Sequence, residues 1–237
     1  MIFRGIRRRA PKAAVAAFAL AVCGLLTGCA DLSAQGSEPG AAPSPTPIAT
    51  PSAQAEAPST SVVVVGDSLS AGDGFDAIPQ DPGSWTMFLD KDLKVTGGWA
   101  RNGATTTSMA DNLELSRGDV LVVMGGTNDA VRSLPVDETR RSVERIVEKV
   151  YTDAVILCAI PPLSRDRDAA TRINTELKEL ATEKGWLWLD PWELYRDGDD
   201  WTSGASLDGL HAGLPAYRSA GLVISEAIEQ VTVTRVG

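Results

Sequence analysis

The sequence of 237 residues is poor in the side chains that bind metals or form disulfides. It has a single histidine, His211, and only three cysteines, Cys23, Cys29 and Cys158. A zinc site needs three or four such ligands near one another, and these residues are scattered along the chain. Cys23 and Cys29 lie in an N-terminal segment that has the features of a secretion signal, described below. Cys158 is then left without a cysteine partner. The sequence therefore predicts no metal site and no disulfide framework.

Nucleotide-binding and calcium-binding motifs are missing as well. Gly66, Gly72 and Gly74 have the wrong spacing for G-x-G-x-x-G, and no P-loop lysine is present. The G-x-S-x-G elbow of α/β-hydrolases is not met, because Ser70 stands where its second glycine should be. The run Asp197-Gly-Asp-Asp200 lacks EF-hand spacing, so a solvated turn is the favoured interpretation. We therefore expect no cofactor, organic or metallic.

Basic residues are in the minority, 22 against 31 acidic ones, and five of them fall within the first 12 residues. An apolar run over residues 13–26 follows, which is too short to span a bilayer comfortably and is typical of a secretion signal. The next residues, Leu26-Thr27-Gly28-Cys29, resemble the bacterial lipobox, in which the cysteine is lipidated and becomes the new N-terminus. Residues 1–28 are therefore predicted to be a lipoprotein signal peptide, with Cys29 as the lipidation site. Ordinary cleavage near Ala30 and an uncleaved anchor are the alternatives.

Residues 29–60 are rich in alanine, proline, serine and threonine, and nothing in them can pack a core. This segment is predicted to be a disordered tether between the lipid and a folded domain. Loss of residues 1–28 leaves 17 basic against 31 acidic residues, a formal charge of −14. Such a surface repels nucleic acid, so no nucleic-acid partner is expected. We expect a monomer on the extracytoplasmic face of the cell membrane, attached to it through Cys29.

Strands and helices alternate over residues 61–237. Short β-branched or apolar runs predict strands at 62–65, 120–124, 154–160 and 186–189, with a weaker candidate at 93–96. Apolar residues at helical spacing lie between them: one set is Val143, Ile146, Val147 and Val150, with Asp137 as a candidate cap, a second ends at Gly185, and a third covers 224–231. This alternation predicts an α/β fold, a single three-layer α/β/α domain with a parallel sheet of about five strands.

Polar residues that suit catalysis follow the predicted strands, where ligands bind in such sheets. Ser68 follows the first strand, Asn102-Gly103 the second and Asn128 the third, and Asp208 and His211 precede the last helix. Each has an ordinary alternative. Ser68 can be a plain N-cap, Asn128 can end a strand, and a lone histidine is usually a surface or core residue.

Taken together, these segments resemble the SGNH hydrolase (GDSL esterase/lipase) family. The matching blocks, in the family's order, are Gly66-Asp67-Ser68-Leu69, Asn102-Gly103, Gly126-Thr127-Asn128-Asp129 and Asp208-Gly209-Leu210-His211. The chain departs from the family at Ala212-Gly213, where Pro-Asn is frequent. The resemblance implies a flavodoxin-like SGNH fold, with Ser68 as nucleophile, His211 as general base and Asp208 as its orienting partner. It also implies an oxyanion hole formed by Ser68, Gly103 and Asn128. Asp67 and Asp129 are interpreted as structural residues that accept hydrogen bonds from nearby turns.

The resemblance implies a serine esterase that acts through an acyl-enzyme. Short connections leave little chain for a lid, which favours small acyl groups such as acetyl, carried by a carbohydrate or another small molecule. The alternatives are a lysophospholipase or thioesterase for longer acyl chains, acyl transfer to a sugar, and a non-catalytic carbohydrate-binding domain on the same fold. Trp192 and Trp201 could stack on a sugar, but packing of the loop is the favoured interpretation.

Overall fold

A parallel five-stranded sheet forms the centre of the computed structural model, which describes residues 59–72 and 83–233. The predicted signal peptide, Cys29 and the tether up to residue 58 lie outside the described residues. The strand order β2-β1-β3-β4-β5 is that of flavodoxin-like folds. The strands are β1 (Thr60–Gly66), β2 (Leu93–Ala100), β3 (Ser116–Met124), β4 (Val150–Cys158) and β5 (Leu187–Leu189). The predicted fold class is confirmed, and the first strand begins one residue before the predicted start of the domain.

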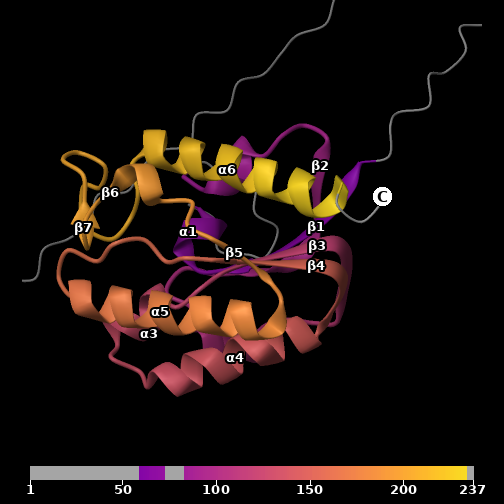
Figure 1. Ribbon diagram of the computed structural model, residues 1–237, viewed down its shortest axis with the longest axis horizontal. Coiled ribbons are helices and arrows are strands. Elements are labelled where there is room, and N and C mark those ends of the chain that lie inside the picture. The colour runs from indigo at the N-terminus through magenta and orange to yellow at the C-terminus, as the bar shows by residue number, and fades with distance from the viewer. Residues whose placement is uncertain (1–58, 73–82, 234–237) are drawn as a thin grey trace, which may run out of the picture. The chain divides into compact units, whose positions relative to one another are not determined.

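Helices cover both faces of the sheet (Figure 1). They are α1 (Ser68–Ala71), α2 (Thr106–Asn112), α3 (Thr127–Val131), α4 (Val136–Glu148), α5 (Arg167–Lys184) and α6 (Leu214–Val233), with 3₁₀ turns η1 (Trp85–Phe88) and η2 (Glu193–Tyr195). A short hairpin pairs β6 (Arg196–Asp197) with β7 (Asp200–Trp201), so the acidic run 197–200 is a turn, as expected. None of the described helices has both the length and the apolar character that a membrane-spanning segment requires.

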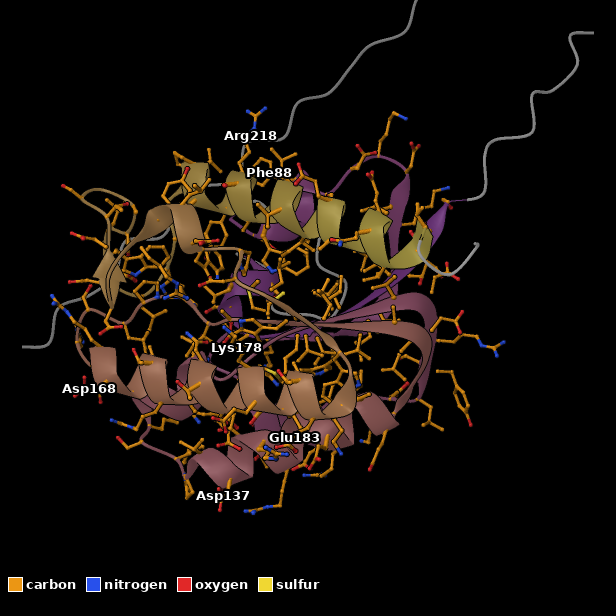
Figure 2. The ribbon with its side chains drawn as sticks, viewed as in Figure 1. Phe88, Asp137, Asp168, Lys178, Glu183 and Arg218 are labelled. Atoms are coloured by element: carbon orange, nitrogen blue, oxygen red, sulfur yellow. The ribbon has the colours of Figure 1, made fainter. Side chains whose placement is uncertain are left out.

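The valine run of β1 shows how the sequence specifies three layers. Val63 and Val65 pack with residues of α2, α4 and α5, whereas Val62 and Val64 pack with residues of η1 and α6. Successive side chains of a strand point to opposite faces, so both faces of β1 meet a helical layer and all four valines are buried. In Figure 2, Asp137 of α4 and Asp168 of α5 point away from this core. Strand β1 ends at Gly66, at the carboxyl edge of the sheet, and Ser68 begins the next helix.

Strand β2 is longer than the predicted run at 93–96 and extends to Ala100. A bulge shifts its pairing with β1 between Val62 and Val63. Gly98 has φ +124°, and a Cβ there would lie 1.9 Å from the Val64 carbonyl oxygen. The Gly97-Gly98 pair therefore bends the strand through a position that only glycine fits, although the same pair in a sequence is typical of a turn.

Two details of the predicted helix at 143–150 are wrong. Helix α4 begins after Pro135, so Asp137 lies in its first turn and is not its cap. The helix ends at Glu148, and Val150 already belongs to β4. Asp137 still favours this end of the helix, because an acidic side chain near the N-terminus complements the helix dipole. The predicted end of α5 is confirmed, since Gly185 caps it with φ +69°.

The close packing of α6 against η1 supports the helix that begins at Ser68. At Gly221 of α6 a Cβ would lie 2.4 Å from the Trp85 carbonyl oxygen, so glycine allows this contact. The Trp85 indole N–H donates to Ser70 Oγ at 3.0 Å, and Ser84 Oγ donates to the Ser70 carbonyl at 2.8 Å. Helix α1 is therefore fixed by the buried hydrogen bonds from Ser84 and Trp85 to Ser70, in addition to its own backbone hydrogen bonds.

The tryptophans before the Asp208 segment belong to the core. Trp192 is fully buried, and its ring lies edge-on to Trp201 and Tyr217, with centroids 5.9 and 6.0 Å apart. Its indole N–H donates to the Ala159 carbonyl at 3.0 Å. These rings pack the loop onto the sheet, as expected. Cys158 is also buried, and burial raises the pKa of its thiol well above the usual range.

Candidate active site

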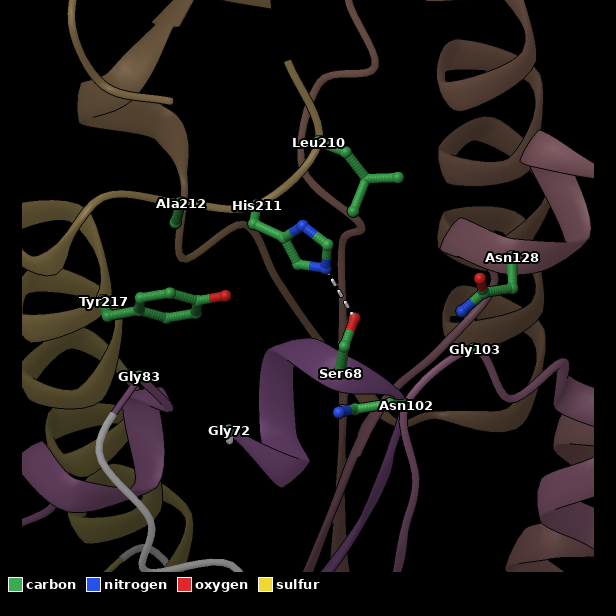
Figure 3. A pocket seen from close by; sticks show the side chains of 10 residues that line it. All are labelled: Ser68, Gly72, Gly83, Asn102, Gly103, Asn128, Leu210, His211, Ala212 and Tyr217. Carbon is green, nitrogen blue, oxygen red and sulfur yellow. Dashed lines mark hydrogen bonds between the residues drawn. The ribbon is translucent and has the colours of Figure 1, made fainter. Parts of the chain in front are cut away.

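An open pocket lies at the carboxyl edge of the sheet, where β1, β2 and β3 end (Figure 3). Its volume is about 550 Å³. The residues that line it come from five separate segments: Ser68, Gly72, Gly83, Asn102, Gly103, Asn128, Leu210, His211, Ala212 and Tyr217. All five residues to which the resemblance assigns catalytic or oxyanion roles are thus either in this lining or, like Asp208, bonded to it. Because these segments are distant in sequence, only the fold brings them together.

Ser68 is placed by a sharp turn between β1 and α1. Asp67 is the N-cap of α1, and its Oδ1 accepts the Leu69 N–H at 3.1 Å, so Ser68 is the first helical residue. The interpretation of Ser68 as a plain N-cap is therefore wrong. At Gly66 a Cβ would lie 2.3 Å from Ser70 Oγ, which shows how tightly the turn is folded. Burial raises the pKa of Asp67 to about 6, against the lowering effect of the Leu69 N–H.

The side chains of Ser68, His211 and Asp208 form one chain of hydrogen bonds. Ser68 Oγ lies 3.0 Å from His211 Nε2, and His211 Nδ1 lies 2.7 Å from Asp208 Oδ2. The first of these contacts is the dashed line in Figure 3. His211 and Asp208 both come from the segment between β7 and α6, and the serine and the histidine are 143 residues apart in the sequence. The lone histidine is therefore neither a core residue nor an isolated surface residue.

Asp208 is held in its ionised form. Burial alone would raise its pKa, but hydrogen bonds from the His211 ring and from the N–H groups of His211 and Leu210 lower the pKa of Asp208 to about 2. The two N–H groups donate to Oδ1 at 2.7 and 2.9 Å, which leaves Oδ2 for the imidazole. An ionised carboxylate beside Nδ1 favours the tautomer with its proton on Nδ1. The lone pair of Nε2 is then directed at the Ser68 hydroxyl.

Ser206 closes the turn that carries Asp208 and His211, and nothing in the sequence singled it out. Its Oγ donates to the His211 carbonyl at 2.6 Å and accepts the Gly209 N–H at 3.0 Å. Gly209 has φ +78°, and its carbonyl accepts the Ser164 N–H at 2.9 Å. The only available signal was a serine two residues before an aspartate, which is common in turns of every kind. The turn is thus fixed internally and to the loop after β4.

Three hydrogen-bond donors of the pocket keep free capacity. The N–H groups of Ser68 and Gly103 have no acceptor among the described residues. Asn128 Nδ2 donates one hydrogen to the Ala104 carbonyl at 3.0 Å, so its second hydrogen is available. Gly103 has φ +74°, a conformation that favours glycine. Donors of this kind can stabilise an oxyanion that develops on a carbonyl bound beside Ser68.

Asp129, the neighbour of Asn128, has a structural role. It is fully buried and accepts the Thr106 N–H at 2.9 Å, the Thr106 hydroxyl, and the Thr139 hydroxyl at 3.1 Å. Its partners lie 23 and 10 residues away in the sequence, at the start of α2 and in α4, whereas the sequence predicted hydrogen bonds from nearby turns. Asp129 therefore ties three helices together beneath the pocket and fixes the start of α3.

The pocket also contains residues to which the sequence assigned no role. Asn102 was only part of the glycine block, and Leu210 only a spacer between Asp208 and His211. The Tyr217 ring, from the first turns of α6, faces the pocket beside His211 (Figure 3). No local pattern marks such residues, because the packing of α6 decides which of its side chains reach the pocket.

In the part of the chain that the structure describes, no cluster of three or more histidine, cysteine or acidic residues could hold a metal ion.

Comparison with known proteins agrees with this geometry. The sequence model of the GDSL-like Lipase/Acylhydrolase family matches residues 64–218, more than half of the chain. A search of curated protein sequences finds no match.

Solved structures share the fold at low sequence identity. A G-D-S-L family protein from Desulfitobacterium hafniense superimposes with a TM-score of 0.57 at 19% identity, covering 70% of this chain and 98% of its own. A carbohydrate acetylesterase family member from Sinorhizobium meliloti gives 0.53 at 19% identity, covering 73% and 98%. The aryl esterase of M. smegmatis gives 0.53 at 16% identity, covering 73% and 100%. The family match over residues 64–218, carried by a chain with this fold, means that the protein belongs to the GDSL-like lipase/acylhydrolase family and is a carboxylic ester hydrolase of that type.

Proposed function

We propose that the protein is a lipid-anchored serine esterase of the extracytoplasmic face, acting as a monomer on short acyl esters. The observation that carries the catalytic part is the hydrogen-bonded chain from Ser68 through His211 to Asp208, at 3.0 and 2.7 Å, in an open pocket. This geometry places a hydroxyl beside a base that is itself oriented by an ionised carboxylate, which is the arrangement that nucleophilic acyl transfer needs.

The reaction follows from these contacts. Ser68 Oγ attacks the ester carbonyl carbon while His211 Nε2 takes the hydroxyl proton. The carbonyl oxygen becomes an oxyanion, which accepts hydrogen bonds from the Ser68 and Gly103 N–H groups and from the free amide hydrogen of Asn128. His211 then gives its proton to the departing alkoxide, and an acyl group remains on Ser68. Water, activated by the same imidazole, hydrolyses this acyl-enzyme and restores the serine.

Two findings support a short acyl group. The pocket around Ser68 is open, and five of its ten lining residues are glycines or asparagines, which offer a long alkyl chain no apolar side chain to contact. One structural relative is a carbohydrate acetylesterase family member, and another is an aryl esterase. Acetyl esters, on a carbohydrate or on a small alcohol, are therefore the substrates that we propose.

One feature favours the alternative, an esterase for longer acyl chains. A second pocket, of about 440 Å³, lies on the other side of Leu210. Val131, Leu163 and Leu210 give it apolar walls. A medium-length alkyl chain that passed Leu210 could bury its methylene groups there, at roughly 0.8 kcal/mol for each. The two specificities differ in which pocket is used, and a single series of substrates separates them.

We expect the rate of hydrolysis of p-nitrophenyl esters to be highest for acetate and to fall with acyl length. The series acetyl, butyryl, hexanoyl, octanoyl and decanoyl is measured as kcat/KM on residues 60–237. Val131→Ala serves as the matched variant, because Val131 lines the second pocket, is absent from the lining of the first and is 53% exposed, so its truncation leaves the core intact. A maximum at octanoyl or longer that disappears in Val131→Ala would replace the short-acyl proposal with the alternative.

Cys29→Ala is expected to move the full-length protein from the membrane fraction to the soluble fraction without changing its specific activity. The lipobox-like run Leu26-Thr27-Gly28-Cys29 supports this proposal, since lipidation needs the cysteine thiol. Cys158→Ala is the control, because Cys158 is buried in the folded domain and should leave the fractionation unchanged. Membrane association that survives Cys29→Ala would point to an uncleaved apolar anchor instead of a lipid.

A further inference from the structure

The turn that contains Gly103 is held by two side chains of α3. Asn128 Nδ2 donates to the Ala104 carbonyl at 3.0 Å, and Arg132 Nη2 donates to the Gly103 carbonyl at 2.8 Å. A backbone hydrogen bond from Ala104 N–H to the Arg101 carbonyl, at 3.1 Å, closes the turn itself. Two successive carbonyls of one turn are therefore bound from one short helix, by residues that are four positions apart.

This turn needs support from outside because of its glycine. Gly103 has φ +74°, and a glycine samples positive and negative φ about equally well when nothing selects between them. Its N–H has no acceptor among the described residues, so no backbone bond fixes the direction of that group. The Arg132 guanidinium is a charged donor, and charge-assisted hydrogen bonds are roughly twice as strong as neutral ones. Arg132 is thus the strongest single contact that selects the Gly103 conformation.

The position of Arg132 at the end of α3 suits it to hold the Gly103 turn. It caps α3, and its own N–H donates to the Asn128 carbonyl at 3.1 Å, so the two side chains move with one backbone. No carboxylate pairs with it in residues 59–72 or 83–233. A Cβ on Gly103 would lie 3.8 Å from Arg132 Nη2, so the guanidinium lies close to the Gly103 backbone as well as to its carbonyl oxygen.

We propose that Arg132 is a positioning residue for ester hydrolysis, which holds the Gly103 N–H in the direction of the developing oxyanion. The proposal rests on the proposed function, in which the Gly103 N–H is one of three oxyanion donors. Arg132 does not touch the substrate in this account. Its effect reaches the reaction through the Gly103 peptide, so it stabilises the transition state more than the bound ester. Because the guanidinium is exposed to solvent, its charge is screened and the effect is moderate.

Arg132→Ala and Arg132→Lys test this in residues 60–237, with Arg141→Ala as the control, since Arg141 is an exposed arginine of α4 for which no bond is seen. We expect Arg132→Ala to lower kcat for p-nitrophenyl acetate roughly 10-fold with KM within 2-fold, and Arg132→Lys to recover part of the loss. A small alkylboronic acid forms a tetrahedral anion on a serine, so its inhibition constant should rise by a similar factor. The control should change none of these values.

A second measurement does not depend on activity. The ¹⁵N order parameter of the Gly103 N–H should fall from roughly 0.85, a rigid backbone, to below about 0.6 in Arg132→Ala, while that of Gly126 stays unchanged. An unchanged order parameter together with a kcat within 2-fold of the wild type would overturn the proposal. A rise in KM alone would also overturn it and make Arg132 a substrate-binding residue. If the unmodified domain hydrolyses no ester, the proposed function fails, and the order parameter alone still decides whether Arg132 fixes Gly103. If Arg132→Ala does not fold, Arg132→Lys decides by the same two measurements.

Discussion

Ser68→Ala is expected to lower the rate of p-nitrophenyl acetate hydrolysis by at least ~10⁴-fold while the protein stays folded. The variant removes the hydroxyl that lies 3.0 Å from His211 Nε2, and no other hydroxyl in the pocket lining except that of Tyr217 could replace it. The oxyanion donors remain, so a small residual rate above that of water is expected. The measurement is kcat/KM on residues 60–237, with the melting temperature as the test of folding.

Ser203→Ala is a suitable control for this experiment. Ser203 is an exposed serine outside the pocket lining, and we see no hydrogen bond from its side chain. It should leave both the rate and the melting temperature unchanged. A rate that survived in folded Ser68→Ala would mean that another group is the nucleophile. Loss of the rate in both variants would indicate damage to the fold.

Asp208→Asn is the change with the second largest expected effect, a loss of roughly 10²–10⁴-fold in kcat. The amide would offer a donor to His211 Nδ1 in place of an ionised acceptor. Nδ1 would then lose its proton to Nε2, and Nε2 could no longer accept the proton of Ser68. We expect the smaller loss, of roughly 10²-fold in kcat, since the Asp208 side chain is 53% exposed and water can partly replace its carboxylate. Asp197→Asn, on the exposed hairpin turn, is the matched control.

The pH dependence and a double variant sharpen this test. The pKa of Asp208 is about 2, so its protonation cannot explain a loss of activity at mildly acidic pH. A loss of activity at mildly acidic pH would therefore point to the group that accepts the serine proton, which must keep a free lone pair. In the Ser68→Ala background, Asp208→Asn should have no further effect. A further large loss there would show that Asp208 acts on the reaction by a route that does not pass through Ser68.

The strands that were easiest to predict are the ones with both faces covered. Val62–Val65 of β1 form an uninterrupted buried run, and such a run has few alternatives. Edge strand β2 was harder, since one side of it faces solvent and Gly97-Gly98 interrupts its pattern. Helix α1 has four residues, fewer than any periodicity can reveal. Its position follows from the Ser70 contacts with Ser84 and Trp85, which join segments on either side of residues 73–82.

The candidate site likewise contains some residues that the sequence predicted and others that only the packed structure reveals. Ser68, Asp208 and His211 stand in short runs with a recognisable order, so the sequence was sufficient to predict that their side chains meet; their catalytic roles stay a prediction. Ser206 and Arg132 were not predicted, because each acts on the backbone of a catalytic turn and any serine or arginine can do that. Their contribution depends on a distance of 2.6 Å to the His211 carbonyl and 2.8 Å to the Gly103 carbonyl. Those distances exist only once α3 and the segment before α6 are packed.

The separation of 143 positions between Ser68 and His211 has a consequence for biosynthesis. A ribosome makes Ser68 long before His211, and strands β2 to β5, helices α2 to α5 and the β6–β7 hairpin lie between them in the chain. On the proposed mechanism, a chain that ends before residue 211 carries the serine without its base, and we expect it not to hydrolyse esters. Proteolytic fragments that end before residue 211 should share this inertness. On the proposed mechanism, this order of elements delays ester hydrolysis until the segment with Asp208 and His211 has packed against the sheet.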